Sequence, residues 1–212
     1  MIFRLNENDL IFPPPELAEE DGLLAVGGDL SPERLLEAYS LGIFPWYSED
    51  TPILWYSPHE RFVIYPDRVK ISKSMRKIMN SGVFRITENE AFEQVIKACA
   101  SVERKDQPGT WITNEMQEAY IKLHQLGFAS SVEVWRGQEL VGGLYGVRSG
   151  QIFCGESMFS KVSNASKAAL IWLCTRKEYT LIDCQLHTEH LERMGAEMIS
   201  RDAYRSFLES LI

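Results

Sequence analysis

Three consecutive stretches of alternating apolar and polar residues constrain the fold of this chain more than any other feature. They span residues 129–135, 139–147 and 151–156, and short turns containing Gly and Arg join them. Such alternation predicts strands with one buried face, and such short connections predict antiparallel neighbours. The centre of the chain is therefore expected to be a three-stranded meander.

Helices and strands alternate on both sides of this meander. Before it, the chain predicts a strand at 61–66, a helix capped by Ser72, a strand at 83–87, a helix capped by Asn89, a polar loop at 103–109 and a helix at 113–126. After it, the chain predicts a helix at 164–176, a strand at 179–184, a helix at 188–194, a strand at 197–199 and a helix from 201. This order of elements is that of an acetyltransferase-like α+β fold with a mixed sheet. We assign residues 60–212 to such a domain.

The first 59 residues have a different character. Turn signals such as Pro13-Pro14-Pro15 recur, so short elements are expected. One helix is clear, because Ser31 is a suitable N-cap, Pro32 suits the first helical position and Gly42 can end the helix. Residues 1–59 are therefore predicted to form a small α+β domain of their own.

Composition narrows the class of protein. The net charge of −8 argues against coating nucleic acid by bulk charge, but it is compatible with a local basic patch. No apolar run approaches the roughly 20 residues that cross a bilayer, and the first residues do not resemble a secretory signal. The four cysteines lack CxxC spacing, which indicates reduced core thiols. We expect a soluble cytoplasmic protein without a membrane segment.

Common motifs for metals, nucleotides and covalent intermediates are missing from the sequence. His187 and His190 are three residues apart but have no third ligand by motif, so no metal is predicted. No GxSxG, GxxxxGK[ST] or GxGxxG is found. Cys184 follows Asp183 directly, without a basic partner to activate it, and a core thiol is the alternative to a nucleophile. These motifs therefore indicate neither a metal site, nor a nucleotide-phosphate loop, nor a hydrolase nucleophile.

Two carboxylates stand among apolar residues near predicted strand ends. Glu156 ends the third strand of the meander, and Asp183 ends the strand LIDCQ. Strand alternation places Asp183 and Gln185 on one face, about 7 Å apart. Buried acids are costly unless they are paired or used. A structural role, such as a helix cap, is one interpretation; a functional site is the other, and Gly142-Gly143 and Gly155 favour it by allowing close backbone approach.

Two tryptophans lie in predicted loops. Trp46 follows Phe44-Pro45, and Trp111 follows Gly109-Thr110. An indole in such a place can stack on a base or ligand ring, or it can fill a seam between domains. The spacing does not decide between these interpretations.

One cluster of basic residues interrupts the acidic chain. It consists of Arg68, Lys70, Lys73, Arg76 and Lys77. On a helix, Lys70, Lys73 and Lys77 would share one face. A solvated helix face is the ordinary interpretation, and a contact with a phosphate backbone is the alternative.

Taken together, the motifs resemble those of a known family. They occupy residues 22–32, 42–46, 53–55, 57–58, 109–113, 139–146, 153–160, 164–167 and 181–185. In this order they closely resemble the bacterial leucyl/phenylalanyl-tRNA–protein transferases over nearly the whole chain. The resemblance implies a cytoplasmic enzyme that transfers Leu or Phe, and in some cases Met, from aminoacyl-tRNA to an N-terminal Arg or Lys. The product marks the acceptor protein for degradation, and no metal or organic cofactor is required.

The resemblance also implies roles for individual residues. Trp46 and Trp111 are expected to hold the 3′-terminal adenosine. The expected pocket for the Leu or Phe side chain comprises Leu144, Phe153, Gly155, Met158, Leu170 and Ile182. Glu156, Asp183 and Gln185 are similar to the polar residues of the reaction centre, with Asp183 electrostatic and Gln185 positioning. The basic residues expected at the tRNA acceptor stem are Lys73, Arg76 and Lys77.

Two rival functions are compatible with parts of this pattern. An acetyl-coenzyme A-dependent N-acetyltransferase would share the fold, but residues 159–164 contain no glycine for a pyrophosphate loop. A non-catalytic tRNA- or peptide-binding module would leave Asp183 and Gln185 with structural roles. The segment between Cys174 and Leu181 is shorter than in the family, so the preference among Leu, Phe and Met stays open.

Overall fold

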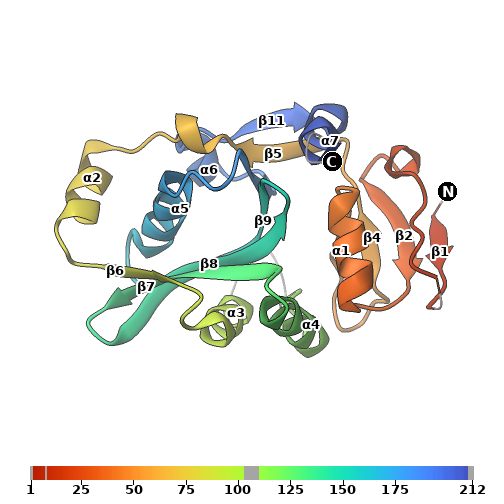
Figure 1. The fold of residues 1–212 in the computed structure, drawn as a ribbon, viewed down its shortest axis with the longest axis horizontal. Coiled ribbons are helices and arrows are strands. Elements are labelled where there is room, and N and C mark those ends of the chain that lie inside the picture. The colour runs from red at the N-terminus through yellow and green to blue at the C-terminus, as the bar shows by residue number, and fades with distance from the viewer. Residues whose placement is uncertain (1, 8, 103–109, 210–212) are drawn as a thin grey trace.

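Two β-sheets follow one another along the chain in the computed structural model, which describes residues 2–7, 9–102 and 110–209 (Figure 1). The expected α+β class is confirmed. The loop predicted at 103–109, including Gly109, lies outside the described residues.

The N-terminal part contains a four-stranded sheet in the order β1-β2-β4-β3. Its strands are β1 (Phe3–Leu5), β2 (Leu23–Gly27), β3 (Phe44–Pro45) and β4 (Leu54–Tyr56), and a short 3₁₀ helix covers Pro15–Leu17. Helix α1 (Pro32–Ser40) begins where the sequence predicts, because the Ser31 hydroxyl accepts the N–H of Arg34. The N-terminal part thus contains both helix and strand elements, as expected.

A seven-stranded mixed sheet in the order β11-β5-β10-β9-β8-β7-β6 forms the remainder. Its strands are β5 (Glu60–Ile64), β6 (Arg85–Glu88), β7 (Ala129–Arg136), β8 (Glu139–Ser149), β9 (Ile152–Ser160), β10 (Leu181–Gln185) and β11 (Glu197–Ser200). The predicted meander is β7-β8-β9, and all its pairs are antiparallel. Strand β10 then pairs with β9 in parallel, which makes the sheet mixed.

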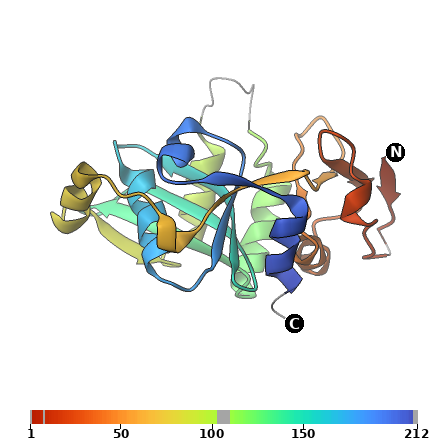
Figure 2. The same ribbon diagram turned by 90° about the horizontal axis from the view of Figure 1, so that it is seen from above.

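Helices cover both faces of this sheet (Figures 1 and 2). Helices α3 (Phe92–Ala100) and α4 (Asn114–Gln125) pack on one face, and α5 (Ala165–Thr175) packs on the other. The remaining helices are α2 (Lys73–Asn80), α6 (Glu189–Arg193), α7 (Arg201–Glu209) and the 3₁₀ turn Pro66–Arg68. Neighbouring residues of β8 serve opposite cores: Tyr145 packs edge-on against Tyr120 of α4, while Leu144 belongs to the core beneath α5.

Asn89 does not cap α3, contrary to the prediction. It adopts a positive φ of 60°, and its side-chain oxygen accepts the N–H of Ser131 at 2.9 Å. The buried carboxylate of Glu133 accepts the N–H groups of Glu90 and Ala91 at the start of α3 instead, each at 3.4 Å. A side chain from the neighbouring strand therefore satisfies the exposed amides of this helix.

Two further expectations need correction. Strand β9 runs beyond Glu156 to Ser160, so Glu156 lies inside the strand and not at its end. Lys70 precedes α2 and cannot share a helical face with Lys73 and Lys77.

One apolar core spans the junction of the two sheets. It contains Trp55 and Leu24 from the N-terminal sheet together with Tyr120 and Cys154 from the larger unit. The sheets divide between Tyr56 and Glu60, but the shared core means that the division into domains at 59/60 stays a prediction.

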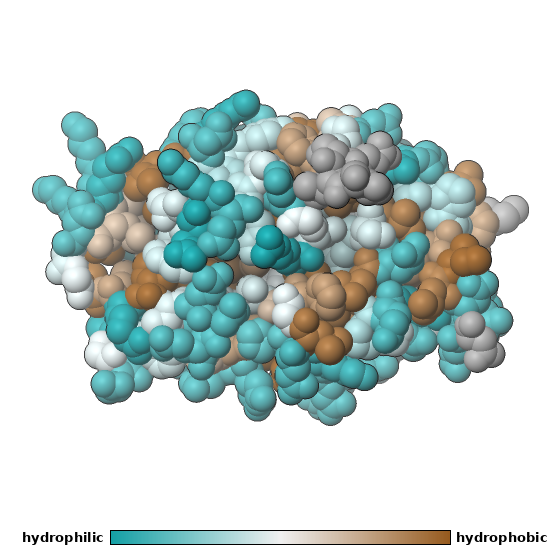
Figure 3. Space-filling view, in the orientation of Figure 1, coloured by the Kyte–Doolittle hydropathy of each residue, from teal (hydrophilic) through white to brown (hydrophobic). Residues whose placement is uncertain are grey.

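The face shown in Figure 3 is mainly hydrophilic, and its apolar patches are separate from one another. None of the helices in the described part of the chain has the length and apolar character that a membrane span requires.

Candidate active site

Strands β9 and β10 separate at the point where the predicted polar residues lie. Their parallel pairing ends at Cys154 and Asp183, although β9 continues to Ser160. The chain beyond this pair leaves room between the two strands. Side chains that follow the last pair can therefore face a common space.

Bulges on both strands set the direction of these side chains. Tyr145 pairs with Ser157 while Gly146 pairs with Gly155, so Glu156 is the extra residue of a bulge. On β10, Asp183 pairs with Val63 and Gln185 pairs with Phe62, which makes Cys184 the extra residue. The regular alternation expected for Asp183 and Gln185 is therefore wrong, since a bulge redirects the residues around it.

The space beside these bulges is a cavity of about 640 Å³. It is lined by all of the predicted pocket and reaction-centre residues, namely Trp46, Trp111, Leu144, Phe153, Gly155, Glu156, Met158, Leu170, Ile182, Asp183 and Gln185. This volume suits a small-molecule site. Residues from six separate segments of the chain, among them β8, β9, α5 and β10, thus meet in one place.

The cavity wall is largely apolar. Leu144, Phe153, Leu170 and Ile182 are buried and belong to the core beneath α5. Trp46 and Trp111 each lie half-buried and pack against the core at the sheet junction. The tryptophans therefore both fill the seam and face the cavity, so the two interpretations of these residues are compatible.

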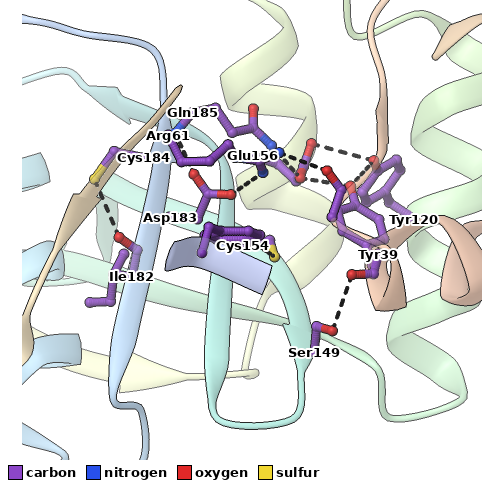
Figure 4. A network of polar contacts seen from close by, with 12 residues as sticks. Tyr39, Arg61, Tyr120, Ser149, Cys154, Glu156, Ile182, Asp183, Cys184 and Gln185 are labelled. Atoms are coloured by element: carbon purple, nitrogen blue, oxygen red, sulfur yellow. Dashed lines mark hydrogen bonds and ion pairs between the residues drawn. The ribbon is translucent and has the colours of Figure 1, made fainter. Parts of the chain in front are cut away.

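Glu156 is held at the cavity by three polar side chains (Figure 4). Tyr39 of α1 and Tyr120 of α4 contact its carboxyl oxygens at 2.7 and 3.3 Å, and the amide of Gln185 donates to it at 2.8 Å. The two tyrosine hydroxyls are 2.5 Å apart. Three contacts join Tyr39, Tyr120 and Glu156, but the two tyrosine hydroxyls supply only two protons. A proton on Glu156 would supply the third hydrogen bond.

Burial raises the pKa of Glu156 to about 7. The hydrogen bonds from Tyr39, Gln185 and Tyr120 oppose this effect, while the charge of Asp183 adds to it. Glu156 therefore titrates in the range where enzymes commonly work.

Asp183 is fully buried and already paired. Its Oδ2 forms an ion pair with Nη2 of Arg61, and its Oδ1 accepts the backbone N–H of Gln185 at 2.9 Å. Burial alone would lower the pKa of Arg61, but the Asp183 carboxylate holds it above its usual value. Asp183 thus acts on the cavity chiefly through Gln185.

Gln185 has a strained backbone at the cavity. Its φ is 59°, and the N–H of Leu186 donates to the carbonyl of Cys184 across it at 2.7 Å. Non-glycine residues seldom adopt positive φ, and such strain is concentrated at functional sites. The turn directs the Gln185 amide toward Glu156.

The remaining candidates for chemistry have weaker support. Burial, and then the charge of Asp183, raise the pKa of the Cys184 thiol well above its ordinary value, which disfavours a nucleophilic thiolate. His187 and His190 line the cavity, but no group of three or more potential metal ligands was found among the described residues. The α2 residues Lys73, Arg76 and Lys77 are exposed and lie outside the cavity.

Comparison with sequence models of protein families shows to which family the chain belongs. The sequence model described as leucyl/phenylalanyl-tRNA protein transferase matches residues 63–209, and the model of the N-terminal domain of the same family matches residues 28–59. The chain belongs to the leucyl/phenylalanyl-tRNA–protein transferase family.

Curated members of the leucyl/phenylalanyl-tRNA–protein transferase family are similar over nearly their full length. The Syntrophus aciditrophicus protein of that name is 57% identical over 94% of this chain and 84% of its own. The Flavobacterium johnsoniae protein is 54% identical over 95% of this chain and 97% of its own. Membership in the family makes the chain an aminoacyltransferase.

The fold also resembles that of a solved structure outside this transferase family. FemX is 9% identical, covers 79% of this chain and 66% of its own, and superposes with a TM-score of 0.50. At this identity the likeness concerns the fold alone, and it agrees with the expected acetyltransferase-like mixed sheet.

Several residues of this cavity and of its polar contacts were not predicted. Arg61, Tyr39 and Tyr120 contact the predicted acids, and additional cavity residues include Phe44, Pro45, Ser157, Leu173, Leu186, Thr188 and Leu191. Arg61 had a visible signal, because a cation within the apolar strand RFVI needs a buried partner. The tyrosines had none, since an aromatic residue on an amphipathic helix is ordinary core.

Proposed function

We propose that the chain transfers Leu or Phe from aminoacyl-tRNA to the N-terminal Arg or Lys of acceptor proteins. The observation that carries the proposal is one cavity, in a member of this family, that joins two tryptophans, an apolar wall and three linked polar residues. The product has a new bulky N-terminal residue and serves as a signal for degradation.

The apolar wall suits the side chain that is transferred. Leu, Phe or Met would lie against Leu144, Phe153 and Ile182, with Met158 at a half-buried position. Gly155 leaves open the volume that a side chain would occupy beside the carbonyl of Asp183. Side chains branched at Cβ would lose about 1–3 kcal/mol of contact energy in such a pocket. Trp46 and Trp111 would hold the 3′-terminal adenosine, since indoles stack on bases.

The reaction needs no nucleophile from the protein, because the aminoacyl ester is already activated. The acceptor's neutral amine forms a bond to the ester carbonyl carbon, and the bond from that carbon to the ribose oxygen breaks. The proton that the amine gives up balances the one that the ribose oxygen receives. The site has mainly to bring the two substrates together, which supplies several kcal/mol of barrier lowering.

The polar residues would align the acceptor. Gln185 would orient the amine through its side-chain amide, and Asp183 would fix the turn that carries Gln185. Since Arg61 neutralises Asp183, Glu156 is the acid that would attract the cationic acceptor, and it would do so in its ionised form, above its pKa of about 7. The exposed α2 residues Lys73, Arg76 and Lys77 would contact the acceptor stem of the tRNA. The use of charged tRNA implies a cytoplasmic location.

The test mixes purified protein with Leu-tRNA and a peptide that begins with Arg, and follows Leu onto the peptide by mass spectrometry. We expect transfer to Arg- and Lys-initiated peptides, and none to an N-acetylated or Ala-initiated control. Failure to transfer Leu or Phe while the tRNA stays charged would contradict the proposal. Transfer from acetyl-coenzyme A in place of aminoacyl-tRNA would favour the acetyltransferase alternative.

A further inference from the structure

Arg61 of β5 is a buried cation that the functional argument above uses only as a partner of Asp183. Its side chain is 2% exposed, and its guanidinium makes several contacts at once. Nη2 pairs with Asp183, and Nη1 donates to the carbonyl of Gly42 at 2.8 Å. The rings of Phe44 and Tyr204 lie against it, with centroids 4.9 and 4.4 Å from Cζ. A buried charge is retained at a cost unless such contacts satisfy it.

These partners come from separate segments of the chain. Gly42 lies between α1 and β3, Phe44 begins β3, Asp183 lies on β10, and Tyr204 lies on α7. One planar group therefore ties the N-terminal sheet, the larger sheet and the last helix together at the cavity (Figure 4 shows Arg61 beside Asp183).

The contacts of Arg61 with the Gly42–Phe44 segment and its ion pair with Asp183 both continue to residues that line the cavity. On one side, Phe44 and Pro45 continue directly into Trp46, and all three residues line the cavity. On the other side, the second oxygen of Asp183 accepts the N–H of Gln185, whose amide reaches Glu156. A displacement of Arg61 would thus move both the cavity wall at Phe44–Trp46 and the turn at Gln185.

We propose that Arg61 is a positioning residue for aminoacyl transfer, which holds the cavity wall at Phe44–Trp46 and the turn at Gln185 in the correct positions relative to each other. This inference rests on the proposed function. Arginine suits the task because its rigid fork donates in several directions within one plane and stacks on rings. A lysine in its place keeps the charge but cannot make all of these contacts.

The test compares Arg61→Lys with Arg201→Lys. Arg201 also joins the C-terminal part to the N-terminal part, through Nη1 to the carbonyls of Pro15 and Ser57, but neither of these partners lines the cavity, whereas Phe44 and Asp183 do. Steady-state transfer of Leu from Leu-tRNA to an Arg-initiated peptide gives kcat and KM, and thermal unfolding gives Tm. We expect Arg61→Lys to lower kcat/KM roughly 10- to 100-fold, with changes in both kcat and the KM for Leu-tRNA. Arg201→Lys should leave both constants near those of the wild type.

Results for the variant test the role of Arg61, and results for the wild type test the proposed function. Wild-type kinetics in a folded Arg61→Lys variant would overturn the positioning role, as would a loss of activity that merely follows the folded fraction. A wild-type protein that does not transfer Leu would instead contradict the proposed function.

A second comparison serves if Arg61→Lys does not fold. Arg61→Met/Asp183→Asn removes both buried charges, which proteins often tolerate, and it is compared with Asp183→Asn alone. We expect a KM for Leu-tRNA several-fold higher in the double variant, because only that variant also releases the Phe44–Trp46 wall. Equal KM values would overturn the inference.

Discussion

Glu156 combines a buried position with a proton equilibrium near neutrality. Desolvation favours its neutral form, and three hydrogen-bonding partners limit how far this preference extends. The folded chain therefore binds a proton on Glu156 more tightly than the unfolded chain, in which the pKa is near 4.5. Stability linked to this residue is fully present below pH 4.5 and is lost as the pH rises through about 7.

Replacing Glu156 with Gln should remove this pH dependence. The interval from 4.5 to about 7 corresponds to ~3 kcal/mol, since each pKa unit is ~1.4 kcal/mol. We expect the free energy of unfolding of the wild type to fall by up to this amount relative to Glu156→Gln between acidic and mildly alkaline pH. Urea denaturation across that range measures it. A stability difference that does not vary with pH would count against the raised pKa.

The backbone of Gln185 offers a second test at the residue scale. Ala normally exceeds Gly in stability inside a strand, but a positive φ reverses that order. Gln185→Gly should therefore be more stable than Gln185→Ala by ~1 kcal/mol, although both lose the amide and both should transfer Leu poorly. Lys177, with a φ of 59° outside the cavity, is the matched control. The same Gly-over-Ala order is expected there with normal activity. An Ala variant as stable as the Gly variant at position 185 would show that the turn is unstrained.

At the scale of elements, the start of α3 depends on a residue from another strand. Glu133 of β7 is fully buried and accepts hydrogen bonds from Thr87, Ser131 and the two amides that precede the helix. All of its partners are donors, so a carboxylate suits the position better than an amide.

Glu133→Gln should destabilise the protein by about 1–3 kcal/mol, because the new NH₂ group faces buried donors. The control is Glu93→Gln on α3, which removes only an exposed pair with Lys97 and should cost less than about 0.5 kcal/mol. Urea denaturation gives both values. If Glu133→Gln costs no more than the control, the buried carboxylate does not hold the start of α3.

Local signals predicted most elements well and failed where distant residues intervened. Ser31, Ser72, Thr113 and Thr188 each accept an amide of the helix that follows, because capping depends on neighbours in sequence. Asn89 has a side chain of the same capping type, but it lies beside β7, and its oxygen accepts the N–H of Ser131 there. The residues around Asn89 in the sequence do not reveal this competing partner, because Ser131 is distant along the chain.

On the scale of the whole molecule, α2 stands at the end opposite the N-terminal sheet in both ribbon views (Figures 1 and 2). Its cations Lys73, Arg76 and Lys77 are exposed, and none of them forms an ion pair with the described residues. Met75 is buried and anchors the helix to the core beneath α5. Unpaired cations on a protein of net charge −8 suit a phosphate backbone.

Lys73→Ala and Lys77→Ala should each weaken tRNA binding and reduce the slope of log affinity against log salt by about 0.9. Fluorescence titration of tRNA at several salt concentrations measures both quantities. The control is Lys97→Ala on α3, whose cation already pairs with Glu93 and should leave the slope unchanged. Slopes unaltered in both α2 variants would exclude these residues from the acceptor-stem contact.

The sequence by itself determined the class of fold, the meander, most helix starts and, through the family resemblance, part of the set of residues that line the cavity, because periodicity, capping and motif order are local properties of the chain. Only the tertiary structure decided how Glu156, Asp183 and Gln185 are held. The bulges at Glu156 and Cys184, the pairing of Asp183 with Arg61 and the contacts of Tyr39 and Tyr120 with Glu156 join segments far apart in sequence. The electrostatics of a buried group depend on which distant partners fold against it, and a linear pattern does not specify those partners.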